Sequence, residues 1–210
     1  MKTDELIEAL AAGIEPVRPA RPSPALLLAG AGAAIAAVAL FLGVRPDLVV
    51  ALQGPAPWLK AGYTLALAGA GLWLLTRLGR PGARARPAAW TLVGIVGIAG
   101  LAGVAEIASL SADARMAAWL GFTWRVCPPN ILLISAFAAP LTFLAARRLA
   151  PTRPMAAGAA LGVLTGAMAA TAYGLHCPEA TLAFLATWYT LGVAAAAVVG
   201  AAVGRFALRW

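Results

Sequence analysis

The two cysteines of this chain lie in similar short motifs, and their chemistry is the most distinctive feature of the sequence. Cys127 stands in Trp-Arg-Val-Cys-Pro-Pro-Asn and Cys177 in Leu-His-Cys-Pro-Glu, and an apolar run follows each motif. Proline is favoured in the first turn of a helix, where no partner is needed for an N–H. We therefore expect both sulfurs at helix N-termini, where the helix dipole favours a thiolate. Such a pair can form a disulfide or bind a soft metal; the alternative is a permanent cross-link or two inert buried thiols.

Two further metal-binding residue types lie beside the second cysteine. His176, the only histidine, precedes Cys177, and Glu179 follows it by two positions. Together with Cys127 and Cys177 they make a chemically reasonable ligand set for zinc, cadmium or another soft cation. The alternative, which we favour for both, is that His176 is a hydrogen-bonding partner and that Glu179 is an acidic residue in the first turn of a helix. No nucleophile–base pair, phosphate loop or nucleotide motif is present. We expect no enzyme, and no cofactor beyond a transient soft or heavy metal ion at the cysteine pair.

The composition indicates an integral membrane protein. Of the 210 residues, 62% are hydrophobic and 11% are charged, whereas a soluble domain carries about a quarter charged residues. The net charge of +8 does not indicate direct binding of nucleic acid, because the basic residues stand at the ends of apolar runs. There they are expected to set the orientation in the lipid bilayer.

Six apolar runs predict an all-α, polytopic fold with six transmembrane helices, because each run approaches the roughly 20 residues that cross a bilayer. They are 25–44, 57–76, 88–110, 129–146, 155–175 and 180–204. With the N-terminus inside, twelve of the 16 Lys and Arg residues lie on the cytoplasmic side. Both termini are then cytoplasmic, and the loops that hold Cys127 and Cys177 are external. In a bacterial inner membrane these loops face the oxidising periplasm.

Residues 1–23 form a separate cytoplasmic segment before the transmembrane domain, 24–210. Thr3 is a plausible N-cap, Asp4 adds a first-turn acid, and Leu6, Ile7, Leu10 and Ile14 form one apolar edge of a short amphipathic helix. Gly13 is the expected end of this helix, and Pro16, Pro19, Pro22 and Pro24 the expected tether. A helix this short is marginal in water, so we expect it to fold on a partner.

Other residues within or near the apolar runs have a structural and a functional interpretation. Glu106 is a functional candidate because of its membrane depth, but we favour an ion pair with Arg115 or Arg125. Asn130 is expected to bond backbone groups of a facing loop, and Trp188 and Tyr189 to pack as aromatic-belt residues. The glycines at 158, 162 and 166 are expected to pack within one bundle; the alternative is a homodimer face. The oligomeric state is left open.

The chain resembles the NrsF-like family of bacterial six-span membrane anti-sigma factors. The resemblance rests on the N-terminal Met-Lys-Thr-Asp-Glu-Leu-Ile, the six spans, Cys-Pro-Pro-Asn-Ile, and His-Cys-Pro-Glu followed by Phe184 and Trp188-Tyr189. It implies that residues 2–14 hold an extracytoplasmic-function sigma factor at the inner membrane. It also implies that Cys127 and Cys177 control the release of this partner under heavy-metal or oxidative stress.

Two other classes of function stay open. A small transporter or channel for an ion or metal would need a polar path, and Glu106 is nearly the only acid in the spans. A thiol oxidoreductase is disfavoured by the single cysteine pair and by the absence of Cys-x-x-Cys.

Overall fold

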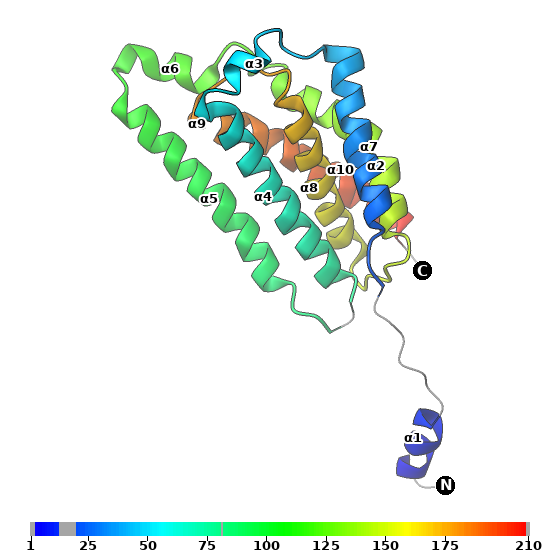
Figure 1. Ribbon diagram of the computed structural model, residues 1–210. Helices are drawn as coiled ribbons and strands as arrows, with labels where there is room; N and C mark the ends of the chain where they lie inside the picture. Colours follow the sequence, from blue (N-terminus) through cyan, green and yellow to red (C-terminus); the bar gives the residue numbers. More distant parts are fainter. Residues whose placement is uncertain (1–2, 13–19, 81, 209–210) are drawn as a thin grey trace.

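The computed structural model describes residues 3–12, 20–80 and 82–208, and the described segments that have regular structure are all helical (Figure 1). The helices are α1 (Thr3–Ala11), α2 (Pro24–Ala37), π-helical η1 (Val38–Leu42), α3 (Leu48–Ala51), α4 (Pro55–Leu78), α5 (Arg86–Ser109), α6 (Ala112–Leu120), α7 (Cys127–Ala146), α8 (Pro154–Tyr173), α9 (Leu182–Phe184), π-helical η2 (Leu185–Tyr189) and α10 (Thr190–Ala207). Proline stands in the first turn of α2, α4, α5, α7 and α8, as its fixed φ and missing N–H favour.

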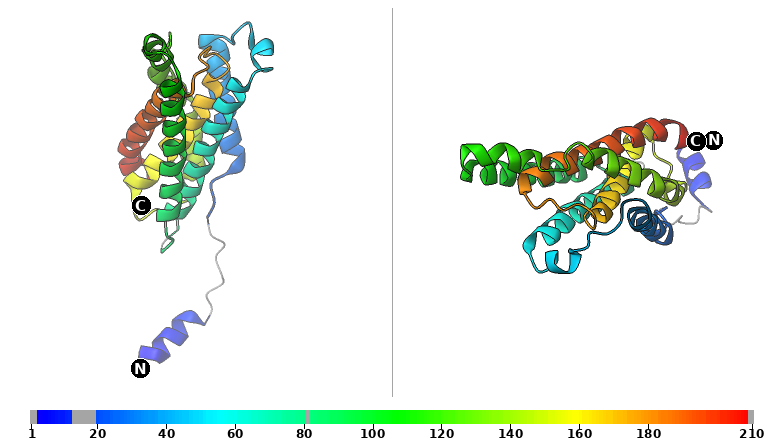
Figure 2. Two further views of the ribbon diagram at one scale, coloured as in Figure 1. Left: turned by 90° about the vertical axis from the view of Figure 1, so that its left-hand side faces the viewer. Right: turned by 90° about the horizontal axis from the view of Figure 1, so that it is seen from above.

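Helix α8 forms the centre of the bundle. It packs against α10, α4, α7 and α2, and about 67% of the residues in its most apolar 18-residue stretch are buried. Helix α5 lies at the periphery against α4, and only 6% of the residues in its corresponding stretch are buried (Figures 1 and 2). Hydrogen bonds between helices add to the apolar packing: Thr142 bonds Thr165 at 2.8 Å and Thr171 bonds Thr64 at 2.8 Å.

Glycines bring α8 and α10 into backbone contact. A Cβ on Gly162 would lie 2.7 Å from the Cα of Ala197, and one on Gly204 would lie 2.6 Å from the Cα of Gly158. Only glycine allows so close an approach of two helices. The expected packing within one bundle is therefore confirmed. The alternative, a homodimer face through residues 158, 162 and 166, is wrong, because these glycines are buried against α10.

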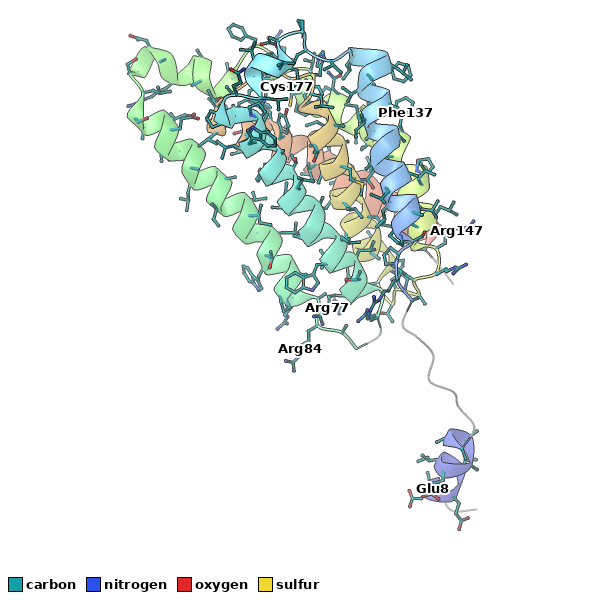
Figure 3. All side chains as sticks on the ribbon, viewed as in Figure 1. Glu8, Arg77, Arg84, Phe137, Arg147 and Cys177 are labelled. Carbon is teal, nitrogen blue, oxygen red and sulfur yellow. The ribbon has the colours of Figure 1, made fainter. Side chains whose placement is uncertain are left out.

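The bundle has two chemically different ends (Figure 1). We call the end formed by residues 43–54, 110–126 and 174–181 the cysteine end, because it holds Cys127 and Cys177. We call the opposite end, formed by residues 20–23, 79–80, 82–85 and 147–153, the arginine end. Figure 3 shows Cys177 at the first end and Arg77, Arg84 and Arg147 at the second. The prediction that both cysteines lie on one side of the bundle is confirmed.

Five helical segments are long and apolar enough to cross a membrane, judged by length and composition: Pro24–Leu42, Arg86–Ser109, Cys127–Ala146, Pro154–Tyr173 and Leu182–Ala207. The remaining predicted span, 57–76, is present as α4, but this helix also includes Lys60 and Arg77 and is not among the five. The helical, membrane-type architecture is therefore confirmed, and the number of spans and their orientation remain predictions.

The predicted N-terminal helix is present as α1, and all its residues are exposed. Thr3 is itself the first helical residue rather than a cap preceding the helix. The predicted helix end at Gly13, the apolar Ile14 and the tether prolines Pro16 and Pro19 lie outside the described residues, whereas Pro22 and Pro24 lead into α2.

Gly162→Ala should destabilise the protein by about 1–3 kcal/mol, because the added methyl group would push α8 away from α10. Thermal unfolding of the full chain in detergent measures this change. The matched control is Gly97→Ala on α5, where no atom lies within 4 Å of the added carbon. The control should lose no stability, because alanine favours helix. Equal losses in both variants would contradict the proposed interface.

Candidate functional site

The two cysteines lie in different local structures at the cysteine end. Cys127 is the first residue of α7, as its motif predicts. Cys177 lies in the loop after α8, and the next helix, α9, begins only at Leu182. The expectation that Cys177 starts a helix is therefore wrong: Pro178 opens an extended stretch that carries Glu179 toward the loop before α7. Both cysteines are free, both are fully buried, and they lie within electrostatic range of one another.

Glu179 joins the two loops that hold the cysteines. Its Oε1 accepts hydrogen bonds from the backbone N–H of Phe122 at 2.8 Å, from that of Thr123 at 2.9 Å and from the Thr123 hydroxyl at 3.0 Å. The predicted first-turn role of Glu179 is thus wrong, because the carboxylate bonds another loop rather than a helix of its own. Gly121 makes room for it: φ is +59°, and a Cβ would lie 2.5 Å from Glu179 Oε2.

Thr123 connects both cysteines to this carboxylate. Its carbonyl oxygen accepts the backbone N–H of Cys127 at 2.9 Å, and its hydroxyl lies 4.0 Å from Cys177 Sγ. One residue therefore contacts the start of α7, the second thiol and Glu179. This threonine carried no signal in the sequence, because its role depends entirely on the loop conformation.

His176 is used in a hydrogen bond and not in a metal site. It joins the loop after α8 to Gly43, which follows η1. Its Nδ1 lies 3.0 Å from the carbonyl oxygen of Gly43, and the backbone N–H of Arg45 donates to the carbonyl of Leu175 at 3.1 Å. Arg45 also forms an ion pair with Asp47, and this guanidinium lowers the pKa of Asp47 below its usual value. The favoured reading of His176 as a hydrogen-bonding partner agrees with this contact.

Within the described part of the chain, no three or more His, Cys, Asp or Glu side chains are grouped as a metal site. Glu179 is occupied by its three donors, and His176 by Gly43. The four-residue ligand set is therefore not assembled in this conformation.

Lys60 is a residue of this site that the sequence did not single out; it entered only the count of the four Lys and Arg residues on the non-cytoplasmic side. It lies in the second turn of α4, is only 5% exposed, and donates from Nζ to the carbonyl oxygen of Cys177 at 3.0 Å. Its ammonium also lies 5.9 Å from the centre of the Tyr189 ring. The available signal was a lysine inside an apolar run, which is costly unless the charge is bonded.

Aromatic side chains lie near Cys177, a placement that the expected aromatic-belt role of Trp188 and Tyr189 did not include. Tyr189 is fully buried beside Cys177, and its ring lies 5.9 Å from that of Tyr173. The Trp188 Nε1 donates to the carbonyl of Trp119 at 2.9 Å. Asn130 lies next to the phenol of Tyr173. Its expected bond to a facing loop is not found among the described residues.

Glu106 has a different partner from the one predicted. Its Oε2 accepts the backbone N–H of Ala183 at 2.9 Å, so it caps the start of α9. The expected ion pair is wrong: Arg115 donates to the carbonyl of Leu110, and Arg125 lies over the ring of Trp124. A side chain bound to the backbone in this way does not support a polar transport path through Glu106.

Apolar helices around a small hydrogen-bonded site at one end define a helical membrane protein in which two free cysteines are buried at that site. The chain belongs to the NrsF family, described as "Negative regulator of sigma F", whose model matches residues 10–210. It is 44% identical to "Anti-sigma-F factor NrsF" of Caulobacter vibrioides and 39% identical to "Probable anti-sigma-F factor NrsF" of Azospira oryzae, in each case over the whole of both chains. No solved structure matches. The family description is that of a regulator rather than an enzyme.

Glu179→Ala should expose both thiols more often, because three charge-assisted hydrogen bonds that close the site are lost. We expect Cys127 and Cys177 to react at least about tenfold faster with methyl methanethiosulfonate in the folded, full-length protein. Mass spectrometry of the labelled protein measures both rates. Asp113→Asn, an exposed acid at the start of α6, is the control and should leave them unchanged. Equal protection in the Glu179 variant would show that the carboxylate does not close the site.

Proposed function

We propose that this chain is a membrane anti-sigma factor whose two cysteines control its hold on the sigma factor. Residues 1–23 retain a sigma factor of the extracytoplasmic-function class at the cytoplasmic face of a bacterial inner membrane. Cys127 and Cys177 respond to heavy metal or oxidant in the periplasm. The observation that carries this mechanism is that α7 begins at Cys127 and that Ala145, in its last turn, accepts the backbone N–H of Ser23 at 3.2 Å. One helix of about 30 Å thus joins the thiols to the base of the N-terminal segment.

The distribution of arginine supports the proposed orientation. The arginine end carries the pairs Arg77 and Arg80, and Arg147 and Arg148, around the point where residues 20–23 enter the bundle. Cationic ends of spans remain on the cytoplasmic side. In this arrangement α4 crosses the membrane as well as the five other long helical segments, which makes six spans. The start of α2 and the end of α10 lie at the arginine end, so both termini are in the cytoplasm.

The apolar edge of α1 is suited to a partner's groove. Leu6, Ile7 and Leu10 are 41%, 58% and 66% exposed, although they are large hydrophobic residues. An amphipathic helix commonly binds by laying such an edge into an apolar groove. The family match and the two relatives named for sigma F support a sigma factor as the partner. Thr3 and Asp4 begin the same helix and complete the proposed binding segment.

The chemical input is a covalent or coordinate link between the two sulfurs. In a disulfide, the thiols of Cys127 and Cys177 lose two protons and pass two electrons to an oxidant such as a peroxide or another disulfide. With a soft cation, both thiols lose protons and the two thiolates bind the metal. Either link draws the start of α7 toward the loop between α8 and α9.

Such a link can move α7 more easily than its neighbours. Helices α8 and α10 are held in backbone contact, so they act as one rigid unit. A displacement of α7 against that unit reaches Ala145 and, through its hydrogen bond, Ser23. A complete switch between the holding and releasing states requires about 5.5 kcal/mol. A disulfide or soft-metal bond can supply this energy, whereas an exposed ion pair cannot.

Replacing Leu6 and Leu10 by Asp in the full chain should abolish retention of the sigma factor, because two charges would enter an apolar groove. Co-purification of the chain with its sigma factor measures this. The control is Ala12→Asp, which adds a charge just beyond the end of α1 and away from the apolar edge, and it should retain the partner. Retention by the first variant would exclude the apolar edge as the binding surface.

Cys127→Ser and Cys177→Ser should each abolish release of the sigma factor by cadmium or peroxide, since either change removes one end of the link. Release from membranes that contain the full chain is the readout, and sigma binding without inducer should be normal. Unchanged release in both variants would end the sensor role of the cysteines.

Ser23→Pro tests the transmission step within the same assay. Ser23 has φ of −67°, which proline adopts, and its side chain makes no capping hydrogen bond. The substitution therefore removes little besides the N–H that bonds Ala145. We expect normal sigma binding with weakened release; full release would show that the signal does not pass through this hydrogen bond.

A further inference from the structure

A groove at the arginine end lies between the start of α2 and the end of α4. Both helices pack on α8 but scarcely on each other, so a cavity of about 500 Å³ remains between them. Its lining combines apolar side chains with the ends of three arginines: Arg21, Pro22, Pro24, Leu27, Leu72, Trp73, Thr76, Arg77 and Arg80. No acidic residue is among them.

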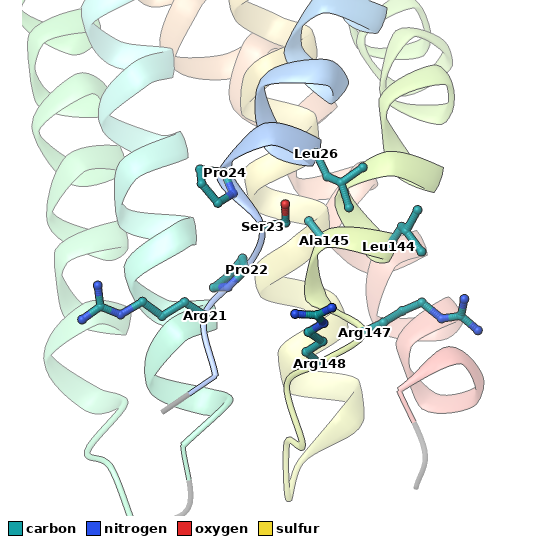
Figure 4. Close-up of a pocket in the computed structure, with 9 residues that line it drawn as sticks. All are labelled: Arg21, Pro22, Ser23, Pro24, Leu26, Leu144, Ala145, Arg147 and Arg148. Atoms are coloured by element: carbon teal, nitrogen blue, oxygen red, sulfur yellow. The ribbon is translucent and has the colours of Figure 1, made fainter. Parts of the chain in front are cut away.

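The three arginines converge on this groove without a carboxylate partner. Figure 4 shows Arg21 pointing away from Arg147 and Arg148, toward the side where α4 lies. Arg77 lies over the ring of Trp73, with 5.9 Å between the guanidinium carbon and the ring centre. The Nε of Arg80 is buried and has no hydrogen-bond partner. Across the described residues, the one ion pair found is that of Arg45 with Asp47, at the other end of the bundle.

Buried or clustered guanidinium groups without acids are suited to an anion. Arginine presents a planar set of N–H donors that matches phosphate, and an unpaired buried donor is costly. The apolar part of the lining, Leu27 and Leu72 with Trp73, lies on α2 and α4, so it continues from the arginines toward membrane depth. A soluble phosphate would leave this apolar wall uncovered, whereas a lipid would cover it.

We propose that this groove binds one anionic phospholipid, with its phosphate on Arg21, Arg77 and Arg80 and an acyl chain along Leu27 and Leu72. Basic pockets between helices at the cytoplasmic surface are suited to such headgroups, and tryptophan favours the same interfacial depth. The site lies beside Pro22 and Pro24, where the N-terminal segment enters the bundle. The bound lipid therefore holds the base of that segment at the membrane surface.

The test is lipid retention by the full-length protein, measured by native mass spectrometry after purification in detergent with added phosphatidylglycerol or phosphatidylcholine. The site variant replaces Arg21, Arg77 and Arg80 by Gln. The control variant replaces Arg84, Arg86 and Arg153 by Gln, which removes the same charge. These three residues are exposed and line neither this groove nor the neighbouring pocket drawn in Figure 4. We expect selective retention of phosphatidylglycerol by the native chain and the control, and at least about tenfold weaker retention by the site variant.

Equal losses in the two variants would overturn the proposal, because the lipid would then respond only to total charge. Displacement of the lipid by millimolar glycerol phosphate would also overturn it, because the ligand would be a free phosphate. A third arm removes two of the three acidic charges of α1 with Asp4→Asn and Glu8→Gln. A marked rise in lipid retention there would show that the acidic helix occupies the groove instead. Arg80→Gln alone should already weaken retention, because the buried Nε of Arg80 has no hydrogen-bond partner within the described chain. Unchanged retention would overturn the assigned headgroup position.

Discussion

The arrangement of the cysteine end depends on the carboxylate of Glu179. A charged side chain that is 8% exposed is costly to bury, and three donors from one turn offset that cost. These bonds fix the loop before α7 against the loop after α8, which are more than fifty residues apart in the chain. The positions of both thiols depend on this contact, because Thr123 donates two hydrogen bonds to Glu179 and also contacts both cysteine segments.

The helices behind this contact differ in how easily they can move. Helices α8 and α10 cannot slide past one another without a clash of backbones at their glycines. Helix α7 packs on both but has a proline, Pro140, in its interior, where one backbone hydrogen bond is missing. A helix with such a point of weakness, beside a rigid pair, is the element most able to change its position. One end of α7 carries Cys127, and near the other end Ala145 bonds Ser23 at the base of the N-terminal segment.

The sequence was sufficient to predict the long helices, but it was not sufficient to predict the hydrogen bonds between the loops. Apolar runs bounded by proline and arginine identified all the long helices, because length and hydropathy determine a helix in a membrane. The side-by-side glycines on α8 and α10 were likewise legible as packing positions. The roles of Glu179, Thr123 and Glu106 were not, because each bonds backbone groups of a segment remote in sequence. Counting charges assigned Lys60 to a side of the membrane but could not predict its contact, because its Nζ donates to the carbonyl oxygen of Cys177, which is remote in sequence.

The surroundings of the thiols have a consequence for how a sensor built this way would respond. The π-helical turn η2 places Tyr189 inside the bundle beside Cys177, and the Tyr173 ring lies next to it. Wide turns of this kind are rare and concentrate at functional sites. Neither cysteine is exposed, so a reagent reaches the thiols only when the loops at the cysteine end open. If the pair acts as the proposed sensor, the free energy of that opening, to which the Glu179 hydrogen bonds contribute, sets how much oxidant or metal is needed before the pair reacts. The threshold of the proposed sensor then comes from the closed site and not from an unusually reactive thiol.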